Sequence, residues 1–236
     1  MDIAKIAALL DPFLEQSLPP SILDQISIYI DLLLRWNARI NLTAIRHPEE
    51  IVTRHFGESF FLARHLFPTP PKPCHPERSE GRVLGTDHRT PHVLDIGSGA
   101  GFPAIPLKMW APQIHLTMVE SNHKKAAFLR EVARALILTD VNVITDRAEV
   151  LAARPDSPHT EVVTLRAVER FETILPLVVT FLAPQAILAL LVGSAQIPHL
   201  ASLTSLKWNP PIPIPQSHTR VLSIGVHEKS GTMYKF

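Results

Sequence analysis

Residues 92–103 read His-Val-Leu-Asp-Ile-Gly-Ser-Gly-Ala-Gly-Phe-Pro, and this stretch decides the fold. An apolar run from Val93 to Ile96 leads into three glycines at alternate positions, and Pro103 opens a second apolar run at 104–110. This order predicts a strand, a tight turn and a helix. Glycine suits such a turn because the backbone takes positive φ and because a Cβ would collide with an approaching ligand. In an α/β sheet, this is the place where a nucleotide-like ligand binds.

Three classes of ligand site use such a turn, and the residues around it distinguish them. A phosphate-binding P-loop ends in Gly-Lys-Ser/Thr, whereas Phe102-Pro103 stands at that place here. A dinucleotide site has the spacing G-x-G-x-x-G, whereas the spacing here is G-x-G-x-G. Asp95, two residues before the first glycine, would repel a pyrophosphate but would suit a cationic ligand. The turn therefore favours S-adenosylmethionine, which carries a sulfonium and an amino group.

A second carboxylate, Glu120, follows the next predicted strand, at 114–119. At the tip of a neighbouring strand it can accept hydrogen bonds from both hydroxyls of a ribose. An acid in this place serves NAD and S-adenosylmethionine alike. The two acids together make a purely structural glycine turn the less favoured interpretation.

The composition narrows the class of protein. A chain of 236 residues, 46% hydrophobic and 19% charged, predicts a soluble globular protein of one large domain or one domain with an appendage. Its net charge of +1 does not by itself indicate a nucleic-acid partner. No apolar run is long enough to span a bilayer and residues 1–5 lack a secretion signal, so we expect a cytoplasmic protein without membrane contact. Cys74 is the sole cysteine, which excludes an internal disulfide and a cysteine-rich zinc site, and we expect no metal.

The chain divides into three predicted parts. Residues 1–67 are expected to form a helical layer, because apolar residues recur at helical spacing over 2–18 and 20–40 and a helix start follows at 47–50. Residues 68–91 combine prolines and charges without periodicity, which predicts an exposed loop or insertion. Residues 92–236 form the expected cofactor-binding core.

Within this core, strand patterns alternate with helix patterns. Further strands are expected at 141–145, 161–166, 186–192 and 221–226. This alternation predicts an α/β fold with a mostly parallel, Rossmann-like sheet and helices on both faces. We expect the late strands to include an antiparallel edge.

The chain resembles the bacterial ribosomal small-subunit RNA methyltransferase G family, also called glucose-inhibited division protein B, within the class I methyltransferases. The resemblance extends from about residue 20 to the C-terminus, without 68–91. It rests on the glycine turn and on five further segments: Arg35-Trp36-Asn37 with 40–45, Arg54-His55 with Glu58-Ser59, Lys125 with 128–130, 146–149, and 165–167.

This resemblance implies an enzyme that methylates N7 of one guanosine in the decoding-region loop of 16S rRNA, with S-adenosylmethionine as donor. Guanine N7 already offers a lone pair, so positioning and shielding suffice and no general base is expected. The implied partner is 16S rRNA or the assembling small ribosomal subunit, and a monomer is expected.

The resemblance also implies roles for particular residues. Arg166, at the end of a strand beside the donor site, is expected to contact both the cofactor and the target base or phosphate. Further candidates for RNA contact, which could instead form ordinary surface ion pairs, are Arg54, His55, Lys125 and Arg220. The other expected cofactor-binding residues are Asp95, Gly97, Ser98, Gly99, Gly101, Phe102, Glu120 at the ribose, and Ala148 with Glu149 at the adenine edge.

Three positions depart from the family pattern. Val192 replaces a usual lysine, Glu58 replaces an aspartate, and Ala104 stands where glycine is common. The missing lysine bears on RNA affinity and leaves cofactor binding unaffected. The alternatives are a class I methyltransferase with a different acceptor, an NAD-dependent oxidoreductase, and a non-catalytic RNA-binding module.

Overall fold

A central sheet of eight strands organises the molecule. The computed structural model describes residues 1–68, 90–166 and 171–228. The strand order is β3-β2-β1-β4-β5-β8-β6, with β7 paired to β8 beside this path. The strands are β1 (His92–Ile96), β2 (His115–Val119), β3 (Val141–Ile144), β4 (Thr160–Arg166), β5 (Leu182–Gly193), β6 (Leu206–Trp208), β7 (Ile212–Pro213) and β8 (Arg220–His227).

The first five strands of this order are parallel, and β8 runs antiparallel to β5, β6 and β7. The predicted antiparallel edge is therefore confirmed. β5 begins at Leu182, four residues before the predicted strand at 186–192. Apolar alternation could not reveal this beginning, because Pro184 and Gln185 interrupt the pattern there.

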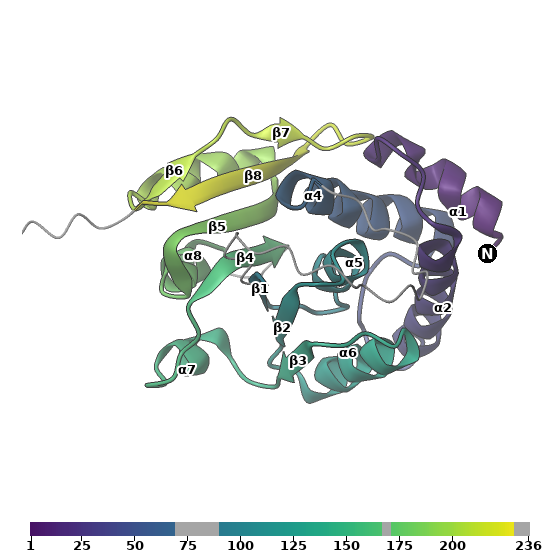
Figure 1. The fold of residues 1–236 in the computed structure, drawn as a ribbon, viewed down its shortest axis with the longest axis horizontal. Coiled ribbons are helices and arrows are strands. Elements are labelled where there is room, and N and C mark those ends of the chain that lie inside the picture. Colours follow the sequence, from purple (N-terminus) through teal and green to yellow (C-terminus); the bar gives the residue numbers. More distant parts are fainter. Residues whose placement is uncertain (69–89, 167–170, 229–236) are drawn as a thin grey trace, which may run out of the picture.

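Helices cover both faces of the sheet, as the alternating pattern predicts (Figure 1). Their bounds are α1 (Ile3–Leu10), α2 (Pro20–Asn37), α3 (Pro48–Glu50), α4 (Glu58–Leu66), α5 (Ala104–Trp110), α6 (His123–Ala135), α7 (Ala148–Ala152) and α8 (Phe171–Val179), with the short or irregular helices η1 (Asp11–Phe13), η2 (Ile51–Gly57) and η3 (Ser194–Ser202).

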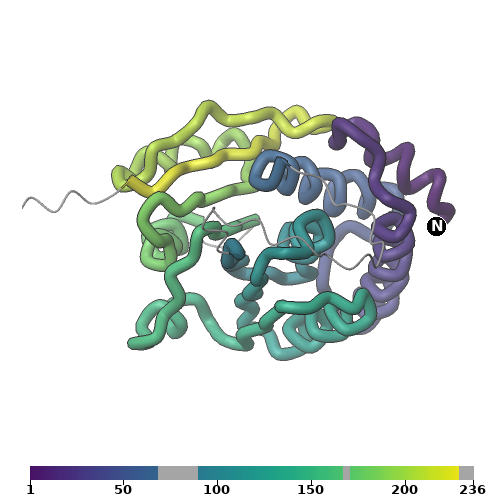
Figure 2. The backbone as a smooth tube through the Cα atoms, viewed as in Figure 1, coloured from purple at the N-terminus to yellow at the C-terminus, as the bar shows by residue number. Residues whose placement is uncertain are grey.

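Successive residues of β1 supply two separate cores, because side chains alternate across a strand. Val93 belongs to a hydrophobic cluster with residues of α1, α2, α4, α5 and α6. Leu94 belongs to a second cluster, with residues of α7 and α8. The N-terminal helices form the outermost layer over the first face (Figure 2). This layer shares one hydrophobic cluster with the sheet. The domain boundaries expected at residues 67 and 92 stay predictions. Residues 69–89 lie outside the described residues.

Two details of the helical layer differ from the pattern. The first helix ends at Leu10 and continues as a 3₁₀ turn containing Pro12, so it is shorter than the 2–18 stretch. The predicted helix start at 47–50 is present as α3, which runs on through a π-helical stretch, η2, into α4. Gly57 is the last residue of η2 and packs against Phe13. A Cβ added at Gly57 would lie 2.6 Å from the Phe13 ring. π-Helical turns are rare and often occur at functional sites.

Candidate functional site

A cavity of about 700 Å³ lies where β1, β2 and β4 end, which is the edge of a parallel sheet that binds ligands. It combines the glycine turn with side chains of the helical layer. Its lining residues are Leu42, Thr43, Ala44, Ile45, Arg54, His55, Gly97, Ser98, Gly99, Ala100, Phe102, Glu120, Ser121, Asn122, Lys125 and Arg166.

The three glycines of the turn have positive φ, of 70° at Gly97, 56° at Gly99 and 85° at Gly101. They serve different purposes. A Cβ on Gly99 would meet only a backbone oxygen at 3.8 Å, so this position leaves space on the cavity side. A Cβ on Gly101 would meet the Tyr29 hydroxyl and, at 2.7 Å, Ile105. Gly101 thus allows close packing of the turn on α2 and α5, and it does not line the cavity.

Glu120 lies at the end of β2, on the cavity wall, and both of its oxygens accept backbone N–H groups. Oε2 accepts from Gly99 and Oε1 from Asn122, each at 2.8 Å. Asn122 in turn caps α6 by accepting from the backbone N–H groups of the next helical turn. Each carboxylate oxygen has a second acceptor site. The fixed Glu120 carboxylate can therefore accept further hydrogen bonds from a ligand.

Asp95 belongs to β1, two residues before the first glycine of the turn, and it is 1% exposed. Its Oδ1 accepts from the Thr164 hydroxyl at 2.6 Å, and its Oδ2 has no hydrogen-bond partner among the described residues. Burial raises the pKa of this carboxyl to about 6, although the Thr164 hydrogen bond opposes the rise. Asp95 is not among the cavity-lining residues, so its predicted contact with a cofactor remains a prediction.

Aromatic rings form the wall beside the turn. Phe102 stacks on His55 with ring centroids 4.6 Å apart and on Tyr29 with centroids 5.1 Å apart. His55 Nε2 lies 2.9 Å from the Thr43 hydroxyl oxygen. Burial, together with the nearby arginines, holds the pKa of His55 well below its usual range. The imidazole is therefore neutral, which suits a wall beside a cationic ligand.

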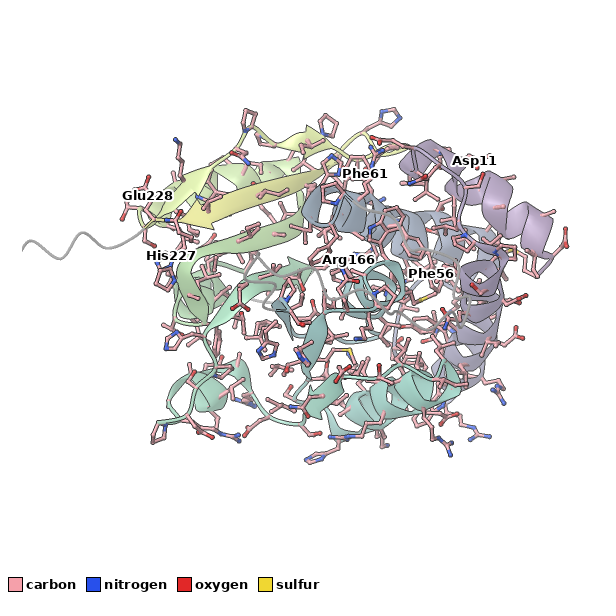
Figure 3. All side chains as sticks on the ribbon, viewed as in Figure 1. Asp11, Phe56, Phe61, Arg166, His227 and Glu228 are labelled. Atoms are coloured by element: carbon pink, nitrogen blue, oxygen red, sulfur yellow. The ribbon has the colours of Figure 1, made fainter. Side chains whose placement is uncertain are left out.

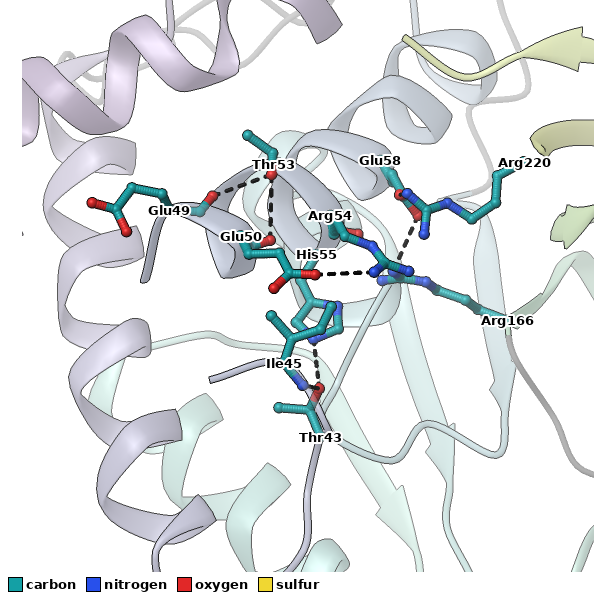
Figure 4. A network of polar contacts seen from close by, with 10 residues as sticks. All are labelled: Thr43, Ile45, Glu49, Glu50, Thr53, Arg54, His55, Glu58, Arg166 and Arg220. Atoms are coloured by element: carbon teal, nitrogen blue, oxygen red, sulfur yellow. Dashed lines mark hydrogen bonds and ion pairs between the residues drawn. The ribbon is translucent and has the colours of Figure 1, made fainter. Parts of the chain in front are cut away.

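Arg166 extends from the end of β4 into a network of polar contacts (Figures 3 and 4). Its guanidinium donates to the backbone carbonyl of Arg54 at 2.6 Å and to Glu58 Oε2 at 3.1 Å. Arg220, at the start of β8, pairs with Oε1 of the same glutamate. Arg54 pairs with Glu50 at 3.0 Å. The network joins three segments that are far apart in the sequence.

The structure brings together most of the predicted site residues. Arg54, His55, Lys125 and Arg166 line one cavity with the turn residues. Arg220 reaches the same network without lining the cavity, and Ala148 and Glu149, at the start of α7, are also absent from the lining of the described part.

The prediction missed the loop Leu42–Ile45 as a wall of the cavity. Asn37 holds this loop: its side chain accepts from the backbone N–H groups of Leu42 and Thr43 and donates to the Thr43 carbonyl. The signal was present in the Trp-Asn and Asn-Leu-Thr segments, which imply a fixed structure but not its position beside the turn.

Within residues 1–68, 90–166 and 171–228, no group of three or more His, Cys, Asp or Glu side chains is placed to hold a metal ion. No helix of the same residues has the length and apolar character needed to cross a membrane.

Comparisons with known proteins agree on one family. The family model for rRNA small subunit methyltransferase G matches residues 22–69 and 82–205, more than half of the chain. A protein named Ribosomal RNA small subunit methyltransferase G from Bacillus pumilus is 33% identical over 184 residues, which cover 76% of this chain and 67% of that protein. One of the same name from Roseiflexus castenholzii is 41% identical over 153 residues, covering 64% and 57%. The chain thus spans 57% to 67% of the length of these two relatives.

A crystal structure of a candidate O-methyltransferase from Klebsiella pneumoniae superposes with a TM-score of 0.56 over 85% of this chain and 90% of that one. At 12% identity this likeness shows the fold alone. Together with the strand order, it confirms the predicted class I, Rossmann-like fold.

Proposed function

Because this chain belongs to the rRNA small subunit methyltransferase G family, we propose that it transfers the methyl group of S-adenosylmethionine to N7 of one guanosine in the decoding-region loop of 16S rRNA. One observation carries the proposal. The lining of a single cavity combines the glycine turn and Glu120 with three cations, Arg54, Lys125 and Arg166. The turn and Glu120 suit a nucleoside with a cationic group, and the cations suit an RNA phosphate or a base oxygen.

The donor side fits S-adenosylmethionine through several features of the described residues. Glu120 is fixed by two backbone N–H groups and keeps acceptor capacity for the ribose hydroxyls. Gly99 leaves space where a Cβ would stand. The neutral His55 ring and Phe102 provide a wall without positive charge. We place Asp95, the remaining turn residues and Ala148 with Glu149 around the same ligand, as the resemblance implies.

When bound, S-adenosylmethionine would supply an electrophilic methyl carbon for the lone pair of guanine N7. The protein has to aim the lone pair at this carbon and exclude water. A side chain that donated a hydrogen bond to N7 would occupy that lone pair. Arg166 and Arg54 must therefore hold guanine O6 or a phosphate and leave N7 free.

We place the reaction in the cytoplasm, on 16S rRNA or the assembling small subunit, and we propose that the protein acts as a monomer. The acceptor supports the first statement, because ribosomal RNA is found in that compartment. Analytical ultracentrifugation of the purified protein tests the second.

Methyl transfer to defined acceptors tests the function. Labelled S-adenosylmethionine is offered with naked 16S rRNA and with small-subunit particles, both from cells that lack this enzyme, and the modified base is mapped. We expect label on N7 of one guanosine and a preference for one of the two substrates. If the protein binds S-adenosylmethionine but labels neither substrate, the acceptor is different or the chain is a non-catalytic RNA-binding module.

A further inference from the structure

A buried carboxylate lies among the arginines beside the cavity. Glu58 is the first residue of α4 and is 1% exposed. Its two oxygens pair with Arg166, from the end of β4, and with Arg220, from the start of β8. Figure 4 shows both guanidiniums directed at this carboxylate, with Arg54 next to them. We call Glu58, Arg54, Arg166 and Arg220 the arginine cluster.

The cluster is a costly arrangement for stability alone. Burial removes hydration from Glu58 and Arg166 and part of it from Arg220, and it raises the pKa of Glu58 and lowers the pKa values of both arginines. Well-packed apolar residues in place of a buried ion pair are often equally stable or more stable. A buried carboxylate between two guanidiniums does, however, fix the direction of their remaining N–H groups.

Those remaining N–H groups lack acceptors. Arg54 Nε, Arg166 Nη1 and Arg220 Nε are buried and have no hydrogen-bond partner among the described residues. Within ion-pair distance the three arginines have two carboxylates, Glu58 and Glu50, so these pairs leave positive charge in excess, although Asp95 also acts on Arg166 from farther away. Buried donors need water, an ion or a ligand. Arg64 Nε, outside the cavity, is in the same state, so it is the position of Arg54 and Arg166 on the cavity wall that points to the acceptor.

We propose that Glu58 is a positioning residue that holds Arg166 and Arg220, together with Arg54, as a binding site for a phosphodiester of the acceptor RNA next to the target base. The inference rests on the proposed function, since it assumes an RNA substrate. It names the RNA group that binds at this end of the cavity and the residue that prepares the site.

The chemistry of the cluster favours an RNA phosphate over the carboxylate of the methyl donor. That donor carries an ammonium beside its carboxylate, and the excess positive charge of the cluster would repel the ammonium. The cluster also extends beyond the donor cavity, because Arg220 belongs to it but does not line the cavity. A polymer that crosses the cavity edge can reach both parts.

The substitution Glu58→Gln distinguishes positioning from simple charge. It removes a negative charge, so charge alone predicts tighter RNA binding. Positioning predicts the reverse: a KM for RNA raised roughly tenfold or more, an unchanged KM for S-adenosylmethionine, and a dependence of log affinity on log salt that is shallower by about 0.7 to 1. Glu58→Asp keeps the charge and should restore part of the RNA affinity. Tighter RNA binding by Glu58→Gln would overturn the proposal.

A second variant is needed because Glu58→Gln leaves two buried guanidiniums without their counter-ion and can unfold the protein. Arg220→Gln leaves the Glu58–Arg166 pair in place, and its side chain is 24% exposed. We expect weaker RNA binding, by roughly tenfold or more, with the same loss of salt dependence and unchanged S-adenosylmethionine affinity.

Arg64→Gln is the matched control. Arg64 is 20% exposed and pairs with Glu15, but it lies outside the cavity lining. This variant should bind RNA with the wild-type affinity and salt dependence.

The outcomes separate the two proposals. If the unaltered protein methylates no RNA, the proposed function fails. If it methylates 16S rRNA while Arg220→Gln behaves like Arg64→Gln, only the phosphate site fails. If Arg220→Gln instead loses S-adenosylmethionine affinity and keeps its RNA affinity, the cluster binds the donor carboxylate and the inference is wrong.

Discussion

The hydroxyl of Tyr29 donates a hydrogen bond to the backbone carbonyl of Ala100 at 2.5 Å, although the two residues are 71 positions apart. Tyr29 lies on α2 and is fully buried, and Ala100 belongs to the glycine turn. The N-terminal helical layer thus holds the backbone of the glycine turn directly. Burial raises the pKa of this phenol well above its usual range, so the hydroxyl keeps its proton and remains a donor.

Tyr29→Phe should separate the hydrogen bond from the packing. The ring can keep its stack on Phe102, but the Ala100 carbonyl loses its donor. We expect a loss of about 1–3 kcal/mol in the free energy of unfolding and a weaker affinity for S-adenosylmethionine. Chemical denaturation and calorimetric titration measure the two effects. Unchanged values for both would mean that the turn does not need this support.

Gly99→Ala and Gly101→Ala should impair different properties, the first ligand affinity and the second stability. Both positions have positive φ, so each alanine carries backbone strain of about 1–2 kcal/mol. Only at Gly101 would the new Cβ also collide with Tyr29 and Ile105. We expect Gly101→Ala to lower the melting temperature much more, and Gly99→Ala to lose S-adenosylmethionine affinity while staying folded. A Gly99→Ala protein with full affinity would show that no ligand approaches there.

Glu120→Gln should weaken S-adenosylmethionine binding. The amide keeps one acceptor oxygen, but its NH₂ group would face a backbone N–H that now bonds to a carboxylate oxygen. We expect a loss of affinity of roughly tenfold or more by calorimetry, because charge-assisted hydrogen bonds are the stronger kind. Glu172→Gln, on α8 and outside the lining of the cavity, is the control and should bind normally.

Asp95→Asn should change how stability depends on pH. Burial raises the pKa of this carboxyl from its ordinary value of 3.8 to about 6, so the folded state holds its proton more tightly. The contribution of this group to stability is therefore greatest below about pH 4 and falls by about 3 kcal/mol as pH rises from about 4 to 6. The asparagine variant should lack this fall. Denaturation at several pH values measures it, with the exposed Asp24→Asn as control, which should keep the wild-type slope.

Runs of apolar residues and the turn residues beside them predicted the sheet well, because the apolar residues of a strand are the ones that the fold buries. Val93 to Ile96 and the glycines after them predict β1 and its turn, and Asn122 predicts the start of α6. The π-helical stretch Ile51–Gly57 could not be predicted. It depends on tertiary packing, in particular on the ring of Phe13 against Gly57, and no local periodicity encodes that contact.

The sequence predicted many of the residues that line the site. It did not predict which residues their side chains contact. Asp95 and Thr164 are 69 positions apart and meet only because β1 and β4 pair in the register that places them side by side. The sequence identifies Glu58 as part of a family segment, with glutamate in place of aspartate, but not its partners, because neither Arg166 nor Arg220 is near it in the sequence. Contacts of this kind are set by strand order, which local propensity does not contain.

The position of Arg220 has a consequence for the newly made chain. Synthesis proceeds from the N-terminus, so Glu58 and Arg166 are made long before β8, which carries Arg220. Until β8 pairs with β5, Glu58 has only one of its two guanidinium partners. Contacts so distant in sequence form slowly. A partly synthesised chain can therefore already hold its glycine turn against α2 and still lack the arginine that completes the cluster.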